Sequence, residues 1–92
     1  MKILEKAIKT FEERGTQYGD FVTRFQRTAQ SLTQLIQAPV TGSDICKMMI
    51  VEKLSRSHDN YLEDNWVDII NYAAMADALQ KEEKQAKIRP IK

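Results

Sequence analysis

The stretch EDNWVDIINYAAMADAL, from Glu63 to Leu79, belongs to the longest helix that hydrophobic periodicity predicts in this chain. At about 100° per residue, two kinds of side chain separate onto opposite sides of that helix. The polar side carries Asp64, Asp68, Asn71, Tyr72 and Met75. The apolar side carries Trp66, Val67, Ile70, Ala73 and Ala74. A polar stripe therefore interrupts an otherwise apolar helix, and the rest of the chain must supply something that faces it.

Three more helices precede this one in the sequence. Helices are predicted at about 2–14, 20–37, 44–57 and 62–86, with a charged tail over 81–92. These bounds follow from the hydrophobic periodicity, the glycines near residue 15, Pro39 and the capping-box pattern Thr41–Asp44. These ranges predict an all-α fold, a bundle-like antiparallel arrangement of four helices in a single domain over residues 1–92. Four large apolar residues are predicted to lie in its core: Met48, Met49, Trp66 and Met75.

Size and composition narrow the class of protein. A chain of 92 residues buries too little surface to be very stable alone, so we expect a homo-oligomer. No apolar run is long enough to cross a membrane, and the mixed N-terminus is unlike a signal peptide, so we expect a cytoplasmic protein. One cysteine and one histidine exclude a Cys/His zinc cluster. The net charge of +1 argues against nucleic acid as a partner.

The acids of the polar stripe need cations nearby. Asp64 and Asp68 lie four residues apart, where like charges repel on one helix face. On the third helix, Lys53 and Arg56 share an arc with Glu52 and are the expected cations. The opposite arc of that helix is apolar and is expected to be buried: Ile50, Val51 and Leu54. Two interpretations remain open, a salt-bridge network between helices and a ligand or metal site.

The turn between the first two helices, ERGTQYGDF from Glu13 to Phe21, combines two glycines with Arg14 and Tyr18. Tyr18 is either a cap packed over the helix junction or part of a glycine-hinged lid. Arg24 and Arg27 lie three residues apart on the second helix, in the pattern of a solvated face or of phosphate contacts.

The order of these motifs resembles a family of small helical phage and prophage proteins of unknown function. The shared features are an Arg-x-x-x-Tyr-Gly turn, a following Phe and Arg, Lys-x-x-Arg at the end of the central helix, and Trp-Val-Asp-Ile leading to Tyr-Ala, over residues 10–79. The matching positions are Arg14, Tyr18, Gly19, Phe25, Arg27, Lys53, Arg56, Asp64, Trp66, Asp68 and Tyr72.

A more distant resemblance is to the all-α nucleoside triphosphate pyrophosphatases of the MazG type, in which four carboxylates from two helices hold magnesium against a triphosphate. This resemblance implies Glu52, Asp64 and Asp68 as metal ligands. Magnesium needs dense oxygen ligands, and here the third helix offers Glu52 alone, followed by two cations. The acidic quartet is incomplete, so we expect no magnesium cofactor unless a neighbouring subunit completes the site.

Together these residues predict a non-catalytic nucleotide-binding protein. The resemblance to phage proteins implies that it captures a nucleotide immune signal of the host, of the cyclic or ADP-ribose type. Arginine and lysine bind phosphate oxygens, and aromatic rings stack on bases. The predicted ligand-binding residues are Arg14, Tyr18, Arg24, Arg27, Lys53, Arg56, Asp64, Asp68 and Tyr72, with no catalytic residue. Two alternatives remain: a MazG-like magnesium-dependent pyrophosphatase, and a helical assembly protein without a small ligand.

Overall fold

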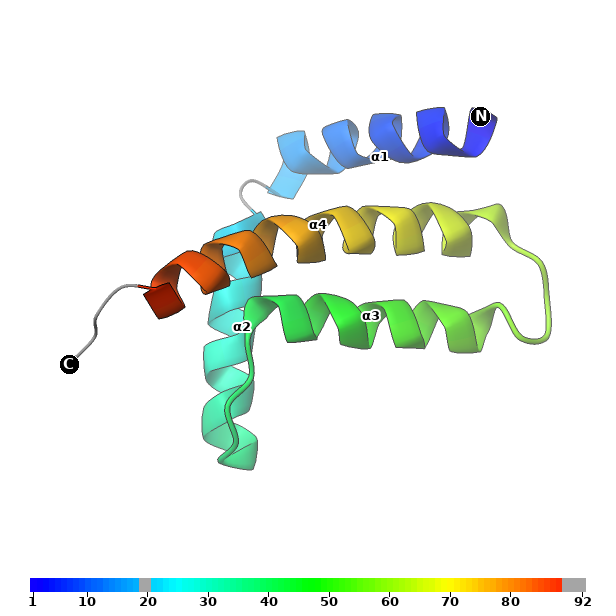
Figure 1. The fold of residues 1–92 in the computed structure, drawn as a ribbon. Coiled ribbons are helices and arrows are strands. Elements are labelled where there is room, and N and C mark those ends of the chain that lie inside the picture. The colour runs from blue at the N-terminus through cyan, green and yellow to red at the C-terminus, as the bar shows by residue number, and fades with distance from the viewer. Residues whose placement is uncertain (19–20, 89–92) are drawn as a thin grey trace.

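A computed structural model describes residues 1–18 and 21–88 and contains four helices over these ranges, with no strand. The helices are α1 (Lys2–Tyr18), α2 (Phe21–Ile36), α3 (Gly42–Arg56) and α4 (Glu63–Ile88) (Figure 1). The predicted all-α fold is confirmed. No helix in the described part of the chain combines the length and the apolar character that crossing a membrane requires.

The helix ends follow local signals. α2 ends before Gln37, whose φ of 56° is the left-handed conformation that often terminates helices, and Pro39 follows two residues later. α3 begins at the predicted capping box: the Thr41 hydroxyl accepts from the Asp44 backbone N–H, and the Asp44 carboxylate accepts from the Thr41 N–H. α1, in contrast, continues four residues past its predicted end, because Gly15 lies within the helix.

α3 and α4 form an antiparallel hairpin (Figure 1). Near the start of α3, Ser43 donates its backbone N–H and its hydroxyl to the Glu83 carboxylate near the end of α4, over 3.0 and 2.6 Å. Towards the other end of α3, the Lys53 Nζ lies 3.0 Å from the Asp68 Oδ2. This pair of helices has the predicted antiparallel arrangement.

α1 and α2 depart from a simple antiparallel bundle. α1 runs in the same direction as α4, since Lys6 Nζ lies 2.6 Å from Glu63 Oε1 and Arg14 Nη1 lies 3.0 Å from Asp68 Oδ1. α2 crosses the hairpin near one end and passes behind α4 in the view of Figure 1. The crossing helix carries the chain from one end of α1 to the start of α3.

The core is small and lies where α2 crosses the α3–α4 hairpin. Its buried apolar residues are Phe25, Ala29, Ile45, Cys46 and Leu79. Close approach of α3 and α4 depends on Gly42, because a Cβ placed there would lie 3.3 Å from Leu79 Cδ2.

The exposure of α4 does not follow the pattern of a simple amphipathic helix. Asp68 and Asn71 on the polar stripe are each only 6% exposed, whereas Trp66 on the apolar side is 37% exposed. α3 also departs from that pattern, because Val51 is 64% exposed while Lys53 turns towards Asp68. The predicted burial is therefore wrong for the exposed residues Trp66, Met48, Val51 and Leu54, whereas Ile50 is half-buried. Cations from two neighbouring helices draw the Asp68 side inward.

Candidate ligand-binding cavity

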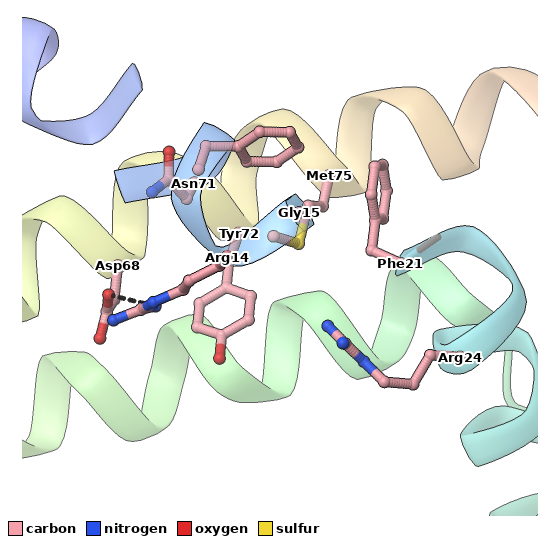
Figure 2. Close-up of a pocket in the computed structure, with 9 residues that line it drawn as sticks. Arg14, Gly15, Phe21, Arg24, Asp68, Asn71, Tyr72 and Met75 are labelled. Carbon is pink, nitrogen blue, oxygen red and sulfur yellow. Dashed lines mark hydrogen bonds and ion pairs between the residues drawn. The ribbon is translucent and has the colours of Figure 1, made fainter. Parts of the chain in front are cut away.

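A cavity of about 540 Å³ lies between α1, α2 and α4 (Figure 2). Pockets that hold small organic ligands have volumes of about 300–1,000 Å³. Its lining residues come from all three helices: Phe11, Arg14, Gly15, Phe21, Arg24, Asp68, Asn71, Tyr72 and Met75. The cavity is therefore large enough for a molecule with one or two rings.

Aromatic side chains form much of the lining. Phe11 and Phe21 meet edge to face, with ring centroids 5.8 Å apart and an interplanar angle of 74°. The Tyr72 ring lies 6.3 Å from the ring of Phe25, a core residue of α2. These contacts hold the aromatic side chains in place, and flat rings packed this way offer surfaces for another flat ring.

Two arginines flank the ring of Tyr72 (Figure 2). Arg14 approaches from α1 on one side, and Arg24 approaches from α2 on the other. The Arg24 guanidinium carbon lies 5.2 Å from the centre of the Phe25 ring, a cation–π distance that supports its position. With Asp68 as the one acid in the lining, the cavity wall has a formal charge of +1, which favours an anionic ligand.

Asp68 joins three helices by ion pairs. Its Oδ1 lies 3.0 Å from Arg14 Nη1 of α1, and its Oδ2 lies 3.0 Å from Lys53 Nζ of α3. Both carboxylate oxygens are therefore engaged with cations. Asp68 positions Arg14 at the cavity wall and offers little to activate a water molecule.

Asn71 contributes an unusual polar group to the cavity wall. Its Nδ2 is buried and has no hydrogen-bond partner among the described residues. A buried donor without a partner costs about 1–3 kcal/mol. A ligand acceptor that reached the Asn71 amide would offset that cost.

The structure brings together four of the predicted site residues and separates most of the others. Arg14, Arg24, Asp68 and Tyr72 line the cavity. Lys53 reaches the Asp68 carboxylate from α3. The Tyr18 side chain and Gly19 lie outside the described residues.

The remaining predicted residues lie elsewhere on the surface. Arg56 Nε bonds Glu52 Oε2 over 2.7 Å, and Asp64 Oδ1 lies 3.4 Å from Lys6 Nζ. Arg27 is exposed on α2 and is absent from the cavity lining. Of the expected pairings between helices, Lys53 with Asp68 is confirmed, whereas Arg56 prefers the acid one turn away on its own helix.

Sequence reasoning missed five lining residues: Phe11, Gly15, Phe21, Asn71 and Met75. Asn71 and Met75 do share the polar side of their helix with Asp68 and Tyr72, so the stripe itself was the signal. The phenylalanines carry no comparable signal, because their role depends on how α1 and α2 meet.

The three candidate metal ligands do not converge. Glu52 pairs with Arg56, Asp64 with Lys6, and Asp68 with two cations. Within residues 1–18 and 21–88, no group of three or more His, Cys, Asp or Glu side chains could hold a metal ion. These residues do not fit a magnesium cage of the MazG type.

One comparison with known proteins gives a match. A family model for a domain of unknown function (DUF6378) matches residues 2–80, which include every residue that lines the cavity. No curated protein and no solved structure matches the chain.

Proposed function

We propose that this chain, which belongs to the family of the domain of unknown function DUF6378, is a non-catalytic nucleotide-binding protein. The observation that carries the proposal is the pair of arginines on either side of the Tyr72 ring, at the wall of a cavity of about 540 Å³ (Figure 2). Cations beside an aromatic ring match the two halves of a nucleotide, its phosphate and its base.

Each half of the ligand has a suitable partner. Arginine binds phosphate oxygens through a planar fork of N–H donors, and Arg24 supplies such a fork from α2. A base stacked on Tyr72 or a neighbouring phenylalanine would gain about 1–3 kcal/mol. In this complex, an acceptor atom of the base or of the ribose would accept a hydrogen bond from the buried Asn71 amide.

Binding without turnover follows from how the acid of the cavity is already paired. Asp68 is the carboxylate of the cavity lining, and both of its oxygens already contact cations. The resemblance to small phage proteins supports a finer proposal, that the ligand is a cyclic or ADP-ribose-type nucleotide used by the host as an immune signal. Holding such a signal unchanged would remove it from its receptor.

A thermal-shift panel of linear and cyclic nucleotides, with and without magnesium, tests the proposal. A ligand at 100 times its Kd adds about 2.7 kcal/mol of stability, which is a rise in Tm of about 14 °C for a domain of 92 residues. Mass analysis of the released ligand should find it chemically unchanged. Magnesium-dependent release of pyrophosphate would instead establish the hydrolase alternative.

Two arginines on the same helix provide a matched pair of variants. Arg24→Ala should reduce the nucleotide-induced rise in Tm, because it removes a phosphate-binding group from the cavity wall. Arg27→Ala removes an exposed arginine outside the lining and should leave the rise unchanged. Equal effects of the two variants, or no rise in Tm with any nucleotide, would contradict the proposal.

A further inference from the structure

The α3–α4 hairpin has an apolar surface on the side that faces away from α2. We call it the hairpin face, and it consists of Ile50, Leu54, Trp66, Ile69, Ile70 and Ala73. Leu54, Trp66 and Ala73 are exposed, and the three isoleucines are partly exposed. Apolar side chains thus occupy two sides of α4, since the buried Leu79 lies on the side that packs against α2.

Helical spacing places these residues on one surface. Trp66, Ile70 and Ala73 follow one another at steps of four and three residues, so they lie on one side of α4. That side is opposite Leu79 and Tyr72, which pack against α2. Figure 1 shows the same relation, with α2 behind α4 and the near side of the hairpin uncovered. An apolar stripe along a helix normally packs against another element.

The exposed area of the chain is large for its mass. A compact monomer of 10.7 kDa exposes about 5,500 Å², whereas this chain exposes 7077 Å². Its radius of gyration is 14.7 Å, against about 12 Å for a compact domain of this length. The surplus is about 1,600 Å² per chain. A standard protein interface takes about 800 Å² from each partner, and obligate dimers take more.

We infer that the hairpin face packs against the same face of a second copy of this chain, forming a two-fold symmetric dimer with a four-helix centre. The face consists of uncharged side chains, so bringing it against itself creates no repulsion between like charges at its centre. The surplus area per chain exceeds the roughly 800 Å² that one partner of a standard interface buries, so it is large enough for a dimer contact. The ligand cavity lies on the α2 side of α4, so dimerisation leaves it open, and this inference stands independently of the proposed function.

Light scattering coupled to size-exclusion chromatography tests the inference on the full chain. The wild-type protein should have a mass twice the 10.7 kDa of one chain. Leu54→Glu and Ile70→Glu should each halve that mass while circular dichroism stays helical, because each places a charge within the interface. Leu35→Glu is the matched control: Leu35 is exposed on α2, away from the hairpin face, and its replacement should leave the dimer intact.

Trp66 gives a second measurement that needs no variant. It is the single tryptophan of the chain, so its fluorescence reports directly on the hairpin face. Emission should shift to longer wavelength on dilution, over the same concentrations at which the mass halves. A wild-type mass of one chain would overturn the inference. So would a dimer that persists in folded Leu54→Glu and Ile70→Glu, or dissociation without any change in Trp66 emission.

Discussion

Among the residues whose ion pairs join α1, α3 and α4, Asp68 is the one whose replacement by alanine should destabilise the fold most. The Lys53 side chain is only 14% exposed, and Asp68 is the acid within ion-pair distance of its ammonium group in the described structure. Removing one partner of a buried ion pair costs about 3–5 kcal/mol, because the other charge stays buried and unpaired. Arg14 is 51% exposed and can turn into water, so its lost contact adds only about 0–1 kcal/mol.

The expected loss of about 3–6 kcal/mol corresponds to a fall in Tm of about 15–30 °C for a domain of 92 residues. Urea unfolding followed by circular dichroism measures it directly. The double variant Asp68→Ala with Lys53→Met should regain about half of the loss, because it removes the unpaired charge. No regain would show that Lys53 is not the source of the penalty.

Asp64→Ala is the control on the same helix. The Asp64 side chain is 81% exposed, and its contact with Lys6 spans 3.4 Å, so its removal should cost less than about 1 kcal/mol. Equal losses for the two aspartate variants would refute the reasoning, because burial of the charge, and not the number of ion pairs, sets the expected difference.

Three further changes test the packing and the buried thiol. Gly42→Ala should destabilise the chain by about 1–3 kcal/mol, because the new methyl group would meet the buried side chain of Leu79 at 3.3 Å. Gly15→Ala should stabilise it by about 0.5–1 kcal/mol, since Gly15 lies within α1 and a methyl group there meets no atom within 4 Å. Urea unfolding measures the change in unfolding free energy for both glycine variants. Burial, with a smaller contribution from Glu83, raises the pKa of the Cys46 thiol from 9.0 to about 11. The folded state therefore binds that proton more tightly than the unfolded state, so this contribution to stability is complete below pH 9 and is lost as the pH rises towards 11. Cys46→Ala should flatten the dependence of the unfolding free energy on pH in this range.

Sequence reasoning succeeded where the controlling interactions are local. Thr41 and Asp44 cap α3 through contacts three residues apart, and Pro39 lies just beyond the end of α2. The polar stripe also grouped Asp68 with Asn71 and Tyr72, which do share one cavity wall. These features depend on short distances along the chain.

It failed where the decisive partner is distant in the sequence. Arg14 meets Asp68 across 54 residues, and that contact turns the polar side of α4 inward. The charge pattern alone favoured Arg56 as a partner of the stripe, but an acid one turn away on the same helix competes for it. The aromatic part of the cavity lining was missed for the same reason, since Phe11 and Phe21 come from α1 and α2.

The two hydrogen bonds between Ser43 and Glu83 limit where the chain can be truncated. The family match stops at residue 80, yet the Glu83 carboxylate that accepts the backbone N–H and the hydroxyl of Ser43 lies beyond that boundary. A truncation at the match boundary would therefore leave the amino end of α3 without its distant cap. Expression designs that retain the chain past Glu83 keep the hairpin closed at that end.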